Sequence, residues 1–262
     1  MKKVFLLLLL VPFLFVMVGC EEDPVEEIDP PSGLVLAGAS NEYYLVISWT
    51  ASSTSDIDGY RVYYNGSATP IYENTSTTFT HGDGTNAPAL GDYEIKAYRG
   101  EEESDALTFD TATRVKTGSF VVCDWLGPDE SGVWINKSTG VATLYSMTAT
   151  ATDGHDKVDF YYDSDISFNS GTLEREGEPN WYWDKHTAFN VSSSTYDDLD
   201  VVDIADYYDG YFITEGQILQ VIYWETTPST WNYGKFRIDS ISGHNATVTF
   251  AIQTIKGWAR ID

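Results

Sequence analysis

Cysteine and basic residues are scarce in this chain, and each scarcity excludes a class of protein. The 262 residues contain two cysteines, and they contain 15 lysines and arginines against 40 acidic residues. The net charge of −25 repels nucleic acid and anionic lipid headgroups, so neither is expected as a partner. Cys123 lies in a strand-like run, which predicts a buried, inert thiol. Cys20 has another predicted role, so no intramolecular disulfide is expected.

Catalytic and metal-binding signatures are also missing. There is no Gly-x-Ser-x-Gly sequence and no credible Cys–His pair. The four histidines have neither HxH nor HExxH spacing: His81, His155, His186 and His244. With this many carboxylates, no particular pair indicates a glycosidase. The sequence therefore predicts no enzyme, no catalytic residue, no metal site and no cofactor.

The amino terminus predicts export. Lys2 and Lys3 precede an apolar run at residues 4–18, which is shorter than the ~20 residues of a membrane span. This pattern predicts a secretory signal peptide over residues 1–19. The segment Met17-Val18-Gly19-Cys20 resembles the lipobox of bacterial lipoproteins, which implies that Cys20 becomes the lipidated amino terminus. Several acyl chains would give stable attachment, so we expect a lipid-anchored cell-envelope protein in the outer membrane, either exposed at the cell surface or facing the periplasm.

Residues 20–32 are predicted to form an extended tether. Six acids and three prolines in this stretch leave nothing with which to build a core. The acidic patch after Cys20 also resembles the surface-export signal of Bacteroidetes lipoproteins. A merely solvated spacer is the alternative interpretation.

Residues 33–114 alternate apolar and polar positions, as half-buried strands do. Three runs share this pattern: Leu45/Ile47/Trp49, Tyr60/Val62/Tyr64 and Tyr93/Ile95/Ala97. Together with Pro30-Pro31, these runs resemble a fibronectin type III domain. The resemblance implies that Trp49 fills the core between two sheets and that Tyr93 closes a strand corner. No Arg-Gly-Asp tripeptide is present, and bacterial copies of this domain mostly act as spacers.

Residues 115–262 predict a second β domain, so the expected fold class is all-β. Strand-like runs occupy residues 132–135, 141–145, 158–162, 218–224, 233–238 and 246–253. Residues 193–208 have helical spacing and predict a short helical insertion in this sandwich-like domain. The layout resembles an uncharacterised domain of Bacteroidetes envelope lipoproteins. That resemblance implies no activity, although some lipoproteins of this general layout capture heme.

The aromatic triplet Trp181, Tyr182 and Trp183 is the candidate ligand-binding segment. Side chains alternate along a strand, so these three cannot all face inward. An exposed indole beside carboxylates suits stacking on a sugar ring or contact with a protein. The alternative is that one face packs on the core and the other on the neighbouring domain.

Two acidic patterns are interpreted as solvated structure. Residues 163–169 with Glu174 have an EF-hand-like spacing, but Phe168 occupies the position that needs glycine. A second series recurs every three residues, as a solvated helix stripe does: Asp197, Asp200, Asp203, Asp206 and Asp209.

These observations predict a non-catalytic envelope lipoprotein in which a fibronectin type III spacer presents a binding domain. The leading ligand is a glycan. The alternatives are a structural or assembly role in contact with another envelope protein, and heme or metal capture.

Overall fold

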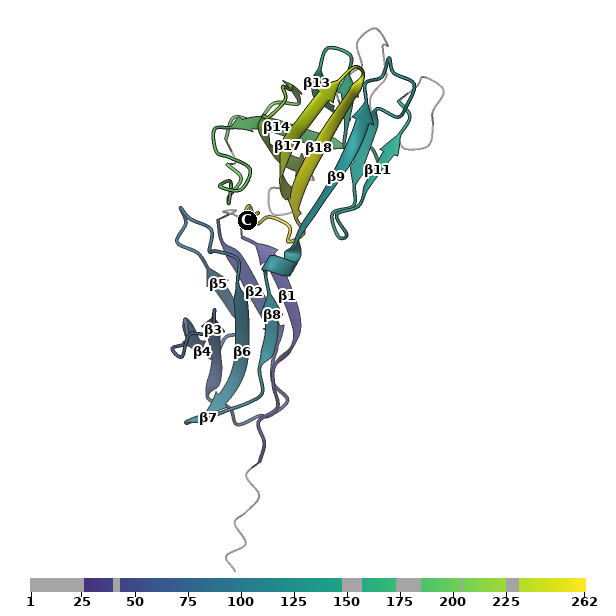
Figure 1. The fold of residues 1–262 in the computed structure, drawn as a ribbon. Coiled ribbons are helices and arrows are strands. Elements are labelled where there is room, and N and C mark those ends of the chain that lie inside the picture. The colour runs from purple at the N-terminus through teal and green to yellow at the C-terminus, as the bar shows by residue number, and fades with distance from the viewer. Residues whose placement is uncertain (1–25, 40–42, 148–156, 173–184, 204, 225–230) are drawn as a thin grey trace, which may run out of the picture.

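The chain folds into two β-sandwiches arranged end to end (Figure 1). The computed structural model describes residues 26–39, 43–147, 157–172, 185–203, 205–224 and 231–262. The single helical element among them is the 3-10 turn η1 (Ala112–Arg114), which lies between the two sandwiches. No helix within these described ranges is long and apolar enough to span a membrane. The prediction of an all-β fold is confirmed.

The first sandwich has the strand arrangement of a fibronectin type III domain. One sheet has the order β1 (Ser32–Gly38), β2 (Leu45–Thr50), β5 (Thr78–His81). The other has the order β4 (Tyr72–Asn74), β3 (Gly59–Tyr64), β6 (Asp92–Arg99), with β7 (Glu102–Glu103) and β8 (Leu107–Asp110) both paired to β6. All of these pairs are antiparallel.

The alternating positions of the first sandwich point into its core as predicted. Trp49 is buried between the sheets and contacts Tyr60 edge-on, with ring centroids 5.5 Å apart. Tyr93 is fully buried, and its hydroxyl bonds to Nδ1 of His81 at 2.7 Å. The corner tyrosine therefore has a side-chain partner, which ties β6 to β5 across the two sheets.

The second sandwich also consists of two antiparallel sheets. One has the order β11 (Ala142–Tyr145), β10 (Gly132–Ile135), β12 (Phe160–Asp163), β13 (Ser167–Ser170), β15 (Gly210–Phe212). The other has the order β14 (His186–Ser192), β16 (Ile218–Trp224), β17 (Asn232–Ser242), β18 (Asn245–Gln253), β9 (Val115–Cys123). The sequence pattern indicated seven of these strands and missed β13, β14 and β15.

Aromatic side chains fill the space between these two sheets. Six buried phenylalanines belong to one core: Phe120, Phe160, Phe168, Phe189, Phe236 and Phe250. Burial of each such side chain contributes roughly 1.5–3 kcal/mol. Cys123 is buried, as predicted. This core can therefore stabilise the domain without a disulfide.

A helical insertion was predicted at residues 193–208, and the structure describes all of these residues except 204. For the described residues the prediction is wrong. A single turn forms there instead, closed by the amide of Leu199 donating to the carbonyl of Thr195 at 3.1 Å. Beyond it the backbone bonds elsewhere: the amide of Val202 donates to Ala259 at 2.9 Å. Buried Lys235 donates to the Leu199 carbonyl at 2.9 Å. These tertiary bonds replace the hydrogen bonds of a helix.

The carboxyl-terminal tail, residues 254–262, lies between the two sandwiches (Figure 1). Ile255 and fully buried Trp258 belong to the core of the first sandwich, whereas Ala259 and Ile261 pack against the second. The backbone contact is close, because a Cβ at Gly38 would lie 1.8 Å from the carbonyl oxygen of Gly257. The end of the chain therefore completes the core of the sandwich formed at its beginning.

Candidate functional site

A cleft of about 250 Å³ lies at the end of the second sandwich where Lys256 of the tail accepts a hydrogen bond from Gly38 of the first sandwich. Its lining comes from the end of β10 and the turn after it, the position before β12, the beginning of β14, the end of β16, the beginning of β17 and the segment after β18. The described residues that line it are Trp134, Lys137, Asp159, Lys185, His186, Tyr223, Trp224, Asn232 and Lys256. Domain junctions are frequent places for ligand sites.

Aromatic rings form much of this cleft. His186 and Trp224 are directly paired residues of β14 and β16, and their rings stack with centroids 4.8 Å apart. Trp231 also packs against Trp224, with ring centroids 4.3 Å apart. Trp134 lies on β10 and is partly exposed. The register of the sheet thus holds the Trp224 ring in a fixed stack.

A buried ion pair lies at the base of the cleft. Asp159 is 3% exposed, and its Oδ2 accepts hydrogen bonds from the amide of Ile135 at 2.8 Å and from Nζ of Lys137. Burial raises the pKa of this carboxyl, and the charge of Lys137 opposes that rise. Thr187 Oγ1 donates to the Asp159 carbonyl at 2.8 Å, which fixes the backbone as well.

Tyr223 brings an unsatisfied hydroxyl to the same cleft. Its side chain is 4% exposed, and its hydroxyl has no hydrogen-bond partner among the described residues. Burial, reinforced by the nearby Asp159, raises the Tyr223 pKa well above its ordinary value. The hydroxyl therefore stays protonated and can donate to a ligand. The ammonium group of Lys137 lies 4.1 Å from the centre of the Tyr223 ring.

His186 is held in place from its other side. Its Nε2 lies 2.6 Å from Oδ1 of Asp209. Asp209 ends the aspartate series that the sequence analysis singled out; four members are exposed, and Asp200 pairs with Arg260 at 3.2 Å. The series is therefore solvated as predicted, although it does not lie on a helix.

The predicted site residues lie outside the described part of the chain. This applies to the candidate ligand-binding triplet Trp181, Tyr182 and Trp183 and to the lipidation candidate Cys20. In the sequence, the triplet is followed by Asp184 and then by Lys185 and His186, both of which line the cleft.

The EF-hand-like segment forms the turn between β12 and β13. The Asp163 carboxylate accepts a hydrogen bond from the Ser164 amide at 2.6 Å and from Asn169 Nδ2 at 3.3 Å. Ile166 adopts a positive φ of 66° within this turn. No group of three or more metal-ligating side chains occurs in the described ranges.

The described histidines lie at three different places. His81 bonds to Tyr93 in the first sandwich, and burial lowers its pKa. His244 bonds to the carboxylate of Asp124 at 2.9 Å, and His186 lines the cleft. His155 lies outside the described residues.

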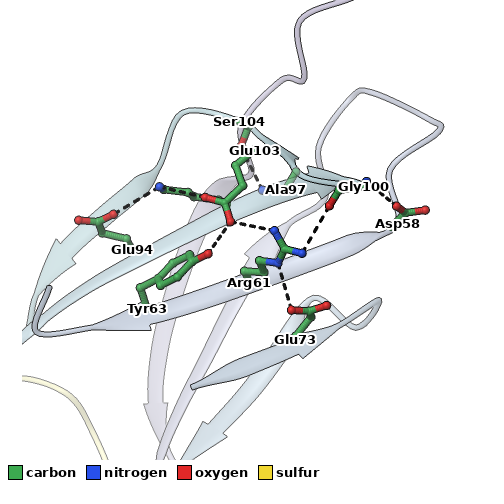
Figure 2. Close-up of polar contacts among 10 residues, drawn as sticks. Asp58, Arg61, Tyr63, Glu73, Glu94, Ala97, Gly100, Glu103 and Ser104 are labelled. Atoms are coloured by element: carbon green, nitrogen blue, oxygen red, sulfur yellow. Dashed lines mark hydrogen bonds and ion pairs between the residues drawn. The ribbon is translucent and has the colours of Figure 1, made fainter. Parts of the chain in front are cut away.

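A second polar cluster covers the outer face of the first sandwich (Figure 2). Arg61 donates from Nε to Glu73 at 3.0 Å and from Nη1 to Glu103 at 3.1 Å. Tyr63 and Lys96 also donate to the Glu103 carboxylate. The charged groups of this cluster are therefore paired with one another on the sheet, as in a network with a structural role.

The pKa values of this network follow from the same contacts. Burial alone would raise the pKa of Glu103. The hydrogen bonds from Tyr63, Arg61 and Lys96 together lower it by more, so the pKa lies below its ordinary value. Burial and the bond to Glu103 raise the pKa of Tyr63 to about 12. Glu103 is thus ionised and Tyr63 protonated around neutral pH.

Trp134, Asp159 and Trp224 were missed as site residues by sequence reasoning. Each falls in a run that was correctly predicted as a strand or its beginning. No local motif indicates that these three runs meet at one end of a sandwich. Lys137 and Lys256 each follow a strand. Many other charged residues do so too, and this position therefore does not mark them as site residues.

No protein-family model matches the chain, and no curated protein matches it. Several solved structures are similar to the chain, and two of them illustrate the low identity. A DUF4466 family protein from Parabacteroides merdae has a TM-score of 0.42 and 12% identity, covering 88% of this chain and 87% of that one. The central fibronectin-III array of RIM-binding protein has a TM-score of 0.26 and 13% identity, covering 76% of this chain and 92% of that one. At these scores neither likeness bears on function.

Proposed function

We propose that this protein is a non-catalytic cell-envelope lipoprotein whose second sandwich binds a glycan in the cleft around Trp134 and Trp224. The single observation that carries the proposal is that the partly exposed indoles of Trp134 and Trp224 line the same cleft as the Tyr223 hydroxyl, which has no hydrogen-bond partner among the described residues. The apolar face of an indole fits the C–H face of a pyranose ring. A buried donor without a partner gains a full hydrogen bond when a sugar hydroxyl reaches it.

Binding is favoured over hydrolysis by the carboxylates of the cleft. Glycosidases use a pair of carboxyl groups flanking the scissile bond. Of the described residues that line the cleft, Asp159 alone is acidic, and it is bonded to Lys137 and to the backbone. A second carboxyl group at the required separation is not among them.

The anchoring part of the proposal rests on sequence. The lipobox-like segment ending at Cys20 and the acidic, proline-rich residues 20–32 suit a tethered protein. The first sandwich then acts as a spacer, because it lies between the tether and the second sandwich and so holds the cleft at a distance from the membrane.

The test is a glycan-array screen of residues 21–262, followed by calorimetry with each hit. Trp134→Ala and Trp224→Ala are each expected to weaken binding at least tenfold, because stacking by one aromatic ring contributes about 1 kcal/mol or more beyond its buried area. Phe212→Ala is the matched control, since Phe212 is 67% exposed on β15 and does not line the cleft.

The array also separates the cleft from the predicted triplet. Loss of binding in a Trp181→Ala/Trp183→Ala variant, with Trp134→Ala and Trp224→Ala unaffected, would move the site to the triplet. Absence of saturable binding to any glycan would contradict the proposal and favour an assembly role.

A further inference from the structure

Part of the cleft lining comes from the carboxyl-terminal tail, which also belongs to the first sandwich. Lys256 of the tail lines the cleft. Two positions later, Trp258 is fully buried in the core of the first sandwich. Figure 1 shows this tail between the two sandwiches. One short segment is therefore shared between the cleft and the core of the neighbouring domain.

Strand β1 holds this segment through its backbone. The Gly38 amide donates a hydrogen bond to the Lys256 carbonyl at 2.7 Å. A Cβ at Gly38 would lie 1.8 Å from the carbonyl oxygen of Gly257 and 2.7 Å from its Cα. Both of these atoms belong to the backbone, so no side-chain rotation could make room for a methyl group. Any side chain in place of Gly38 must therefore push β1 and the tail apart.

The tail also holds the aromatic side chains of the cleft. The amide of Gly257 donates to the carbonyl of Trp231 at 2.7 Å. The ring of Trp231 packs against Trp224, with centroids 4.3 Å apart, and Trp224 lines the cleft. A continuous set of contacts therefore connects Gly38 of the first sandwich with Trp224 of the second.

The second sandwich fixes the last residues of the tail. The Val202 amide donates to the Ala259 carbonyl at 2.9 Å. The Ile261 amide donates to the Asp200 carbonyl at 2.7 Å. Closely packed contacts transmit strain, because they leave little free volume to absorb it. A displacement imposed at Gly38 would therefore fall on the tail residues before Ala259, where the tail lines the cleft.

We propose that Gly38 is a positioning residue for the cleft, so that the first sandwich sets the arrangement of the site as well as carrying it. Strand β1 holds residues 256–257, and these residues hold the Trp224 ring against the rest of the lining. This role of Gly38 rests on the proposed function, which supplies the ligand, and it deepens that function by naming what controls the same site. Coupling between two sites is reciprocal, so a glycan in the cleft also stabilises the contact between β1 and the tail.

The experiment compares Gly38→Ala with the unchanged protein, both as residues 21–262. The first readout is amide hydrogen exchange at Gly257. The second is the exciton couplet of the Trp224–Trp231 pair in circular dichroism, defined as the part of the spectrum that Trp224→Phe removes. The third is calorimetry with the oligosaccharide that binds most tightly in the array.

Two controls separate positioning from stability. Val35→Ala changes an exposed side chain of β1 that does not line the cleft. Tyr60→Phe removes the hydroxyl that accepts a hydrogen bond from the Ser52 amide at 3.0 Å, beyond the end of β2 opposite to Gly38. It weakens the first sandwich away from the tail. Both controls are expected to leave the couplet and the glycan affinity unchanged.

We expect Gly38→Ala to lose part of the couplet, to speed exchange of the Gly257 amide and to weaken glycan binding, the last two by about fivefold or more. Trp231→Leu tests the same link from the second sandwich and does not depend on the folding of Gly38→Ala. In that variant the Gly38 amide, which bonds to the tail, is expected to exchange about fivefold faster or more.

An unchanged couplet and unchanged Gly257 exchange in Gly38→Ala would overturn the positioning role and leave the proposed function intact. Unchanged Gly38 exchange in Trp231→Leu would do the same. If exchange and couplet respond as expected but no glycan binds the unchanged protein, Gly38 positions the cleft and the proposed function is contradicted.

Discussion

Replacement of Trp258 tests most directly whether the carboxyl-terminal tail stabilises the first sandwich. It comes from the carboxyl-terminal tail, is fully buried, and belongs to the core of the first sandwich. Truncation of a buried tryptophan to alanine costs about 3–5 kcal/mol. The Nε1 of Trp258 has no hydrogen-bond partner among the described residues, so its loss removes an unfavourable group. We therefore expect a cost of about 3 kcal/mol for Trp258→Ala.

The cost should fall on the first sandwich. A domain of this size shifts its melting temperature by roughly 4–8 °C per kcal/mol, so its transition in calorimetry of residues 21–262 should move down by about 12 °C or more. Amide hydrogen exchange should locate the loss in β2 and β6, around Ile47 and Ile95. Trp258→Phe is the matched control, because it keeps most of the ring volume, and it should cost about 1 kcal/mol or less.

The reasoning would be refuted if Trp258→Ala left exchange in β2 and β6 unchanged and destabilised only the second sandwich. In that case the tail would stabilise the second sandwich, which precedes it in sequence, and not the first. The first sandwich could then be studied as an independent unit.

Three further predictions concern other parts of the chain. The pKa of His81 is lowered in the folded protein, so as the pH falls the unfolded state takes up this proton before the folded state does. The contribution of His81 to folding stability should therefore be complete above the ordinary pKa of about 6.5 and decrease as the pH drops below it. His81→Gln should flatten this decline in melting temperature between pH 7 and 5, and an unchanged decline would assign it to other groups. Lys235→Met should cost about 2–3 kcal/mol in denaturant unfolding, because it leaves the carbonyls of Tyr196 and Leu199 without their donor; a cost below about 0.5 kcal/mol would show that water replaces it. Cys20→Ala should release the protein from the membrane fraction of cells, and retention there would exclude a lipid anchor at this residue.

The fold class could be predicted from the sequence because period-two patterns are local. Leu45, Ile47 and Trp49 alternate with exposed or half-buried neighbours, and the structure buries all three. In the second sandwich β16 was found with its observed bounds, residues 218–224, since a continuous apolar run needs no tertiary information. The short strands β13 and β15 gave too few residues for a pattern to emerge.

The helix prediction failed because tertiary bonds outweigh spacing. Tyr196, Leu199 and Val202 do pack together against the second sandwich. Their backbone, however, is bonded to Lys235 and to the tail, and those partners lie far along the chain. The spacing of apolar residues was informative about burial and uninformative about backbone conformation.

The cleft could not be predicted for a related reason. Asp159 and Trp224 are 65 positions apart in the numbering, and only the stacking of two sheets brings them to the same end. The predicted triplet rested on exposed aromatic character, and the same character is present in the described cleft. Thus composition indicated the kind of surface, whereas topology determined the residues.

The most direct measurement of the central claim is a crystal structure of residues 21–262 with the oligosaccharide that binds most tightly in the array. We predict a pyranose ring against Trp134 or Trp224 and a sugar oxygen within hydrogen-bonding distance of the Tyr223 hydroxyl. A saccharide bound elsewhere on the protein, with the cleft occupied only by water, would contradict the assignment of the site.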